Sequence, residues 1–208
     1  MNETDHLIDR LAANTDTPRH GVLTRFMAPM AGAAAICALG AVLVLDAAFV
    51  AVTTHGYAPL LVKWSFSIAL VILSGIALWF IGRPGRPTGA AMAALGVPFV
   101  VVGALLALDL AMGRQSFPGE TLDRCLTAMA VMSPIAFAGA ILAARWLAPV
   151  HLRRAGLAAG LFGGAVAMTA YSPFCPERGM VNMAIFYCLP ILAMSALGYL
   201  LGPRLLRW

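Results

Sequence analysis

Hydrophobic residues are arranged along this chain in six long runs, separated by short polar segments. Each run has roughly 20 residues, the length that a helix needs to cross the ~30 Å hydrocarbon core of a bilayer. The runs lie near residues 28–52, 64–82, 89–112, 124–147, 155–172 and 182–202. The pattern therefore predicts an all-α membrane protein with six transmembrane helices.

The composition agrees with this pattern. The 208 residues are 61% hydrophobic and 11% charged, with a mean hydropathy of +0.87, which is more apolar surface than a soluble domain of this length can bury. The first 25 residues contain four acidic residues, whereas a cleavable signal peptide needs a basic start followed at once by an apolar core. We therefore expect a retained soluble tail at 1–25 and a membrane domain at 26–208.

Lysine and arginine are divided unequally between the two sides that six spans create. The side with both termini holds ten arginines, and the other side holds three arginines and one lysine. Because positive residues stay preferentially in the cytoplasm, we expect both termini there. The basic pI of 9.4 then reflects topology and lipid-facing charge, and it gives little reason to expect direct binding of nucleic acid.

A short amphipathic helix is predicted in the tail, at residues 4–13. A helix of this length is marginal in water, so we expect it to become ordered only against a partner. An interfacial helix on the inner leaflet is the alternative, but such helices are basic and this tail is acidic. A basic cytoplasmic protein is the favoured partner, and the expected contact residues are Asp5, Leu7, Ile8, Asp9 and Leu11.

Two aspartates lie inside the hydrophobic runs. Asp46 and Asp109 occupy equivalent places in nine-residue stretches that match at six positions, 63 residues apart, which indicates three similar helical hairpins. An ionisable residue within a span is by default a candidate functional residue. A structural ion pair is the favoured alternative, because charged groups in membranes commonly pair. The available cations are Lys63, Arg114 and Arg124.

Glycines recur along the fifth run, at Gly156, Gly160, Gly163 and Gly164. Residues this small let neighbouring helices approach closely. We interpret them as packing residues and not as a phosphate-binding loop.

The four cysteines fall into two pairs. Cys37 and Cys188 lie within apolar runs, where a thiol behaves as a small hydrophobic group. Cys125 and Cys175 lie at or beyond the outer boundary, where an oxidising compartment would allow them to form a disulfide. They are either a redox-responsive pair or an inert structural bridge, and bridging requires Cα atoms within about 7 Å.

Several short motifs occur at fixed places relative to the six runs. They are the acidic start Thr4–Ala12, the segment Arg124–Leu126, the loop Cys175–Glu177 and the ending Gly202–Trp208. Together with the six spans, these features resemble the NrsF family of bacterial inner-membrane anti-sigma factors. The resemblance covers the whole chain and is strongest in the tail and from Arg124 onward.

This resemblance implies a function. The cytoplasmic tail would bind an extracytoplasmic-function sigma factor of the sigma F type. Cys125 and Cys175 match the family's outward cysteine pair, which is linked to sensing of oxidative or heavy-metal stress. Phe174 stands where the family often has a histidine, and the Phe186-Tyr187 pair stands where it tends to have Trp-Tyr. Without that histidine, direct metal sensing is weakened relative to thiol redox sensing.

Two other functional classes remain open. A membrane thiol oxidoreductase commonly uses a Cys-x-x-Cys pair and often a second relay pair, but the two outward cysteines are far apart in sequence. A small proton- or cation-coupled transporter could use Asp46 and Asp109, although such a site is expected near the midplane between broken helices. The sequence has neither a glycine-rich phosphate loop nor a His-Glu-x-x-His motif, and we expect no enzyme activity, cofactor or bound metal.

Overall fold

The computed structural model describes residues 6, 8–10, 19–44, 56–83, 88–113, 122–175 and 180–207. All regular structure within these residues is helical. Six helical segments are long and apolar enough to cross a membrane: Gly21–Val44, Ala58–Ile81, Gly89–Ala111, Asp123–Arg145, Leu152–Phe174 and Val181–Leu205. The predicted all-α architecture with six apolar helices is confirmed.

Some spans consist of one helix and others of two helices in line. The α-helices are α2 (Arg19–Val44), α4 (Ala58–Ile81), α5 (Gly89–Ala94), α6 (Val97–Ala111), α7 (Leu122–Arg145), α8 (Leu152–Tyr171), α9 (Met180–Met183) and α10 (Leu189–Leu205). A short 3-10 helix, η1 (Ser172–Phe174), follows α8. A π-helical segment, η2 (Ala184–Cys188), joins α9 to α10.

Helices α2 and α4 begin before the hydrophobic runs that predicted them. The first starts at Arg19, in the polar region that precedes the run. The second starts at Ala58, with Pro59 in its first turn. Proline suits this position because its fixed φ matches the helix and its missing N–H is not needed there. As a result Lys63 lies inside α4, within an otherwise apolar span, and not in the preceding loop.

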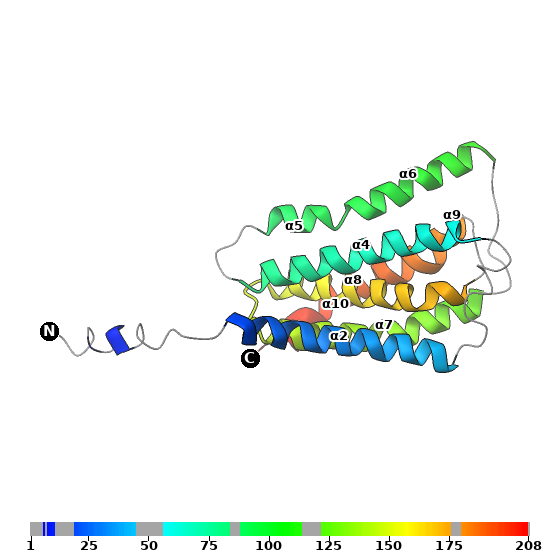
Figure 1. Cartoon of the computed structure of the whole chain (residues 1–208). Coiled ribbons are helices and arrows are strands. Elements are labelled where there is room, and N and C mark those ends of the chain that lie inside the picture. The colour runs from blue at the N-terminus through cyan, green and yellow to red at the C-terminus, as the bar shows by residue number, and fades with distance from the viewer. Residues whose placement is uncertain are drawn as a thin grey trace.

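Helix α8 is the centre of the bundle (Figure 1). Within its most apolar stretch 83% of the residues are buried, against 17% to 50% in the other five spans. Helices α10, α7 and α4 pack around it, and α2 packs on α7 and α8 more than on α4, its neighbour in sequence. The spans run up and down as three hairpins require, but contact with α8 determines how they pack.

The closest contact in the bundle joins α8 to α10. Gly156 and Gly160 of α8 lie directly against the backbone of α10, near Gly198 and Ser195. A Cβ atom added to Gly160 would lie 2.7 Å from the Cα of Ser195, which is too close for two carbon atoms. The glycines of the fifth run therefore pack two backbones together, as small residues commonly do in membrane proteins.

The pair α5 and α6 lies on the outside of α4 (Figure 1). Within α6, Pro98 and Val102 are buried, and most of the other side chains are exposed. Asp109 is half-buried near the end of α6, two residues before Ala111. Asp46 lies outside the described residues.

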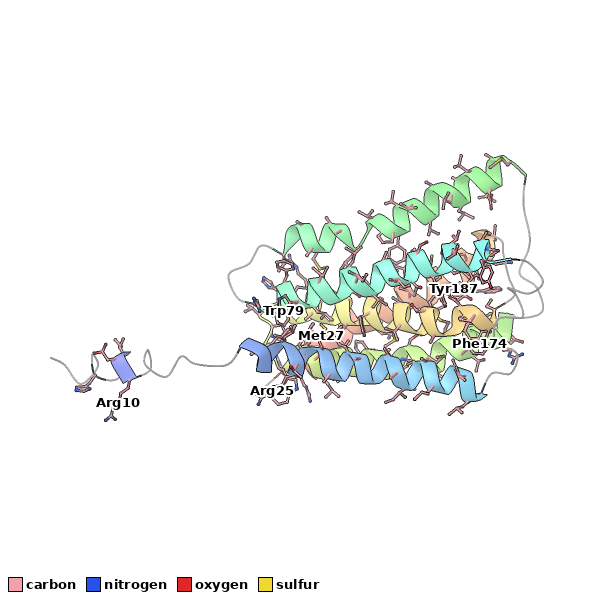
Figure 2. The ribbon with its side chains drawn as sticks, in the orientation of Figure 1. Arg10, Arg25, Met27, Trp79, Phe174 and Tyr187 are labelled. Atoms are coloured by element: carbon pink, nitrogen blue, oxygen red, sulfur yellow. The ribbon has the colours of Figure 1, made fainter. Side chains whose placement is uncertain are left out.

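One end of the bundle gathers arginine and aromatic side chains. The Arg83 guanidinium lies 4.1 Å from the ring centroid of Trp79, and that of Arg25 lies 5.3 Å from Trp146. Figure 2 shows Arg25 and Trp79 at the end where α2 begins, with Tyr187 toward the opposite end. Arginines over tryptophans are typical of a membrane–water interface, so this end has the character of one boundary of the membrane domain.

The contact between α8 and α10 can be tested with one methyl group. The substitution Gly160→Ala should lower the free energy of unfolding by about 1–3 kcal/mol, because the new Cβ meets backbone that cannot move aside as a side chain can. Gly103→Ala is the matched control, since a Cβ there meets nothing within 4 Å. Unfolding of the purified proteins in detergent measures both, and equal stability of the two variants would contradict this contact.

Candidate functional site

Two cysteine side chains meet at the end of the bundle opposite the arginine and tryptophan side chains. Cys125 lies in the first turn of α7, and Cys175 directly follows η1. Their Sγ atoms are 3.4 Å apart. Because a disulfide bond is about 2.0 Å long, the two thiols are in contact but not bonded.

Both thiols are enclosed by protein. The exposed fraction is 0% for Cys125 and 1% for Cys175. The Cys125 thiol donates a hydrogen bond of 3.3 Å to the hydroxyl oxygen of Tyr171, which is the last residue of α8 and is also buried. A reagent that reacts with this pair therefore has to be small enough to pass between packed side chains.

A buried lysine from α4 completes one side of the cluster. The Lys63 side chain is only 6% exposed, and its Nζ donates a hydrogen bond of 3.1 Å to the main-chain carbonyl of Cys175. The same Nζ lies 5.7 Å from the ring centroid of Tyr187. A buried ammonium group needs such partners because its removal from water is costly. Lys63 thus connects α4 to the cysteine segment and to η2.

Tyr187 belongs to the π-helical segment η2. Single π-helical turns within longer helices often occur at functional sites. The Tyr187 side chain is 1% exposed, and its hydroxyl lies beside the Cys175 thiol. Within the described residues this hydroxyl has no hydrogen-bond partner of acceptable geometry. The cluster therefore contains a buried hydroxyl group that makes no well-formed hydrogen bond within the described residues.

This arrangement favours thiol chemistry. Two sulfur atoms in contact can lose two electrons and two protons to become a disulfide, and a neighbouring cation favours the reactive thiolate form. Among the described residues, no group of three or more His, Cys, Asp or Glu side chains could hold a metal ion. We define Cys125, Cys175, Lys63, Tyr171 and Tyr187 as the thiol cluster.

The other residues predicted as functional lie away from this cluster or outside the described part of the chain. Ile8 and Asp9 belong to a short helical segment at residues 8–10, and both are exposed. Asp5, Leu7, Leu11 and Asp46 lie outside the described residues. Asp109 is placed on α6, as described above.

Sequence reasoning did not connect Lys63, Tyr171 or Tyr187 with the cysteines. A lone lysine within an apolar span is itself a signal of function, but the second hydrophobic run begins at residue 64, and this pattern places Lys63 in the preceding loop. The two tyrosines carry no such signal, because a tyrosine near the end of a span is usually an interfacial anchor.

Comparison with known proteins identifies the family. The family described as "Negative regulator of sigma F", NrsF, matches residues 11–208. A "Probable anti-sigma-F factor NrsF" from Azospira oryzae is 38% identical over 152 residues, which are 71% of each chain. An "Anti-sigma-F factor NrsF" from Caulobacter vibrioides is 29% identical over 214 residues, which are 99% of each chain.

No solved structure matches the chain significantly. The family match, by contrast, extends over all six candidate spans and the whole thiol cluster. A match of this extent is not confined to a shared hydrophobic pattern in one or two helices. The chain therefore belongs to the NrsF family and is a multi-pass membrane anti-sigma-F factor, a regulator and not an enzyme.

Proposed function

We propose that this chain holds an extracytoplasmic-function sigma factor at the cytoplasmic face of a bacterial inner membrane and releases it when Cys125 and Cys175 react. Family membership implies the sigma factor partner. The observation that carries the proposed trigger is the distance of 3.4 Å between the two sulfur atoms. This contact joins segments that are 50 residues apart in sequence, and it needs only a small movement to become a bond.

The distribution of charge supports cytoplasmic termini. Helix α2 begins and α10 ends at the same end of the bundle (Figure 1). Arginines gather at this end, where Arg145 also donates a hydrogen bond of 2.9 Å to the carbonyl of Leu205. The thiol cluster lies at the other end, which under this orientation faces the oxidising periplasm.

The tail is the proposed binding segment for the sigma factor. Ile8 is 57% exposed and Asp9 is also exposed, so an apolar and an acidic side chain are available for a partner. The family match begins at residue 11, so for residues 1–10 the proposal rests on their acidic, amphipathic pattern and on the relative that aligns over 99% of this chain.

Helices α7 and α2 form the proposed route from the thiols to the tail. Cys125 lies on α7, and α2 packs closely on α7. A Cβ atom added to Gly139 of α7 would lie 2.7 Å from the carbonyl oxygen of Pro29 in α2. The Cys37 thiol of α2 donates a hydrogen bond of 3.4 Å to the main-chain carbonyl of Met132 in α7. A shift of α7 on bridging would therefore displace α2, whose chain continues into the tail.

Oxidation is the favoured trigger, and capture of a soft metal by the two thiols is the alternative. Soft metal ions bind thiolates strongly, but they usually take more than two protein ligands. Phe174 stands beside Cys175 in place of a histidine, and the described residues offer no third ligand at the cluster. Formation of a disulfide needs no further ligand.

The orientation predicts the result of reporter fusions. Fusions truncated after Pro118 and after Glu177 should read as periplasmic, and a fusion after Trp208 should read as cytoplasmic, because six spans return the chain to its starting side. Alkaline phosphatase and green fluorescent protein are complementary reporters for the two sides. A periplasmic reading after Trp208 would overturn the proposed topology.

Truncation of a leucine in the tail should weaken sigma factor binding. Burial of a leucine side chain contributes roughly 1.5–3 kcal/mol, so Leu11→Ala should weaken the affinity about tenfold or more. Leu39→Ala is the matched control, because Leu39 is 61% exposed on the membrane-spanning part of α2. Binding of purified sigma factor to the full-length protein in nanodiscs measures both. Equal affinities of the two variants would argue against a binding site in the tail.

The cysteine pair should be required for the response to stress. Cys125→Ser and Cys175→Ser strains should lose the induction of sigma F-dependent transcription by oxidant or cadmium, while Cys188→Ser, the matched control from a span, should keep it. Labelling of free thiols in intact cells before and after treatment follows the pair directly. A normal response in both pair mutants rules out the trigger, and a permanent bridge with an unaltered response identifies a structural disulfide.

A further inference from the structure

The Tyr187 hydroxyl is a buried donor beside a reactive atom. Within the described residues it makes no hydrogen bond of acceptable geometry, although buried hydroxyl groups in proteins are normally hydrogen-bonded. The π-helical turn of η2 places it there, next to the Cys175 thiol. A buried hydroxyl of this kind can donate a hydrogen bond to an acceptor that enters the site during function.

The polar atoms around Cys175 select what can enter. Cys125 already donates its proton to Tyr171, so its sulfur accepts the proton of Cys175 in the contact of 3.4 Å. Two further donors lie near Cys175. The Lys63 ammonium group bonds its main-chain carbonyl, and the Tyr187 hydroxyl lies beside its thiol. These donors favour a ligand that accepts hydrogen bonds, and the burial of both thiols limits it to a small, uncharged molecule.

We infer that Cys175, Tyr187 and Lys63 form a reaction site for hydrogen peroxide or a small alkyl hydroperoxide. This inference rests on the proposed function, in which reaction of the cysteine pair is the trigger. Attack on a peroxide expels hydroxide or alkoxide, which are strong bases and leave much faster when a neighbouring acid protonates them. A sulfinate leaving group, such as that of methyl methanethiosulfonate, is a weak base and needs no such acid.

The reaction balances with the peroxide as oxidant. The Cys175 sulfur attacks one peroxide oxygen, an S–O bond forms with two electrons from sulfur, and the O–O bond breaks. Tyr187 gives its proton to the departing oxygen and receives the proton that Cys175 loses, so the products are a sulfenic acid and water or an alcohol. Cys125 then attacks the sulfenic sulfur, and its proton leaves with the hydroxyl group as water, which yields the disulfide.

Lys63 is the positioning residue of this site. Its hydrogen bond of 3.1 Å to the Cys175 carbonyl positions Cys175, which attacks the peroxide. Its contact with the Tyr187 ring positions Tyr187, which donates the proton. Its positive charge also favours the thiolate. These roles require a cation at this place, which lysine and arginine both supply.

The decisive measurement is the rate of thiol oxidation in the purified full-length protein in nanodiscs. With hydrogen peroxide, Tyr187→Phe should slow loss of the two thiols at least tenfold, given the rate factor of about 10²–10⁴ usual for a positioned acid. With methyl methanethiosulfonate, a small uncharged reagent, the same variant should react at the parent rate. Tyr199→Phe is the matched control from α10, where the Tyr199 ring centroid lies 5.5 Å from the Arg153 guanidinium carbon. This variant should behave as the parent with both reagents.

Lys63 is tested in the same assay. Lys63→Gln should slow the reaction with both reagents, because the cation that favours the thiolate is lost, and Lys63→Arg should restore most of the rate. Failure of arginine to restore any rate would overturn a role that depends on charge.

The outcomes separate this inference from the proposed function. If Tyr187→Phe reacts with peroxide as fast as the parent, or is slowed equally with both reagents, Tyr187 is not the proton donor, while a bridge between Cys125 and Cys175 in the parent still supports the trigger. If the parent forms no such bridge with either reagent, the proposed trigger fails and this inference fails with it.

Discussion

The rest of the structure depends on the direct contact between the backbones of α8 and α10. Lipid chains are as apolar as leucine, so the hydrophobic effect does not drive helices together within a bilayer, and close packing has to hold them. Glycines such as Gly156 and Gly198 make this possible, because the two helices meet where neither has a side chain. This contact also fixes the thiol cluster, since α8 leads into Cys175 and η2 leads into α10.

The thiol cluster is a group of polar side chains enclosed at one end of this packed core. Within it the ammonium group of Lys63 is stabilised by the Cys175 carbonyl and the Tyr187 ring. Electrostatic effects of such groups are stronger than at a hydrated surface, because little water screens them. A change in the charge or bonding of Cys175 therefore alters its interactions with α4 and η2 as well as with α7.

Sequence patterns predicted the spans well, because the thickness of the bilayer dictates the length of an apolar helix. They also placed Cys125 and Cys175 on one side, since that follows from counting spans. They could not give the distance between the sulfurs, which depends on how α7 packs against α8. Lys63 was missed because a polar residue near the start of a span resembles a loop residue until the helix start at Ala58 is known. The place of Tyr187 depends on the π-helical turn, for which the sequence has no clear signal.

Transmission across the membrane requires a bond that stabilises one arrangement of helices over another. A shift from 1% to 99% of a released state needs about 5.5 kcal/mol of differential free energy, and a disulfide that fits both states equally would supply none. Closing the sulfurs from 3.4 Å to about 2.0 Å would bring the start of α7 and the end of α8 closer together. In the proposed mechanism α7 is the helix that has to yield, because α8 is held by α10, and its close contact with α2 near Gly139 would carry that movement toward the tail.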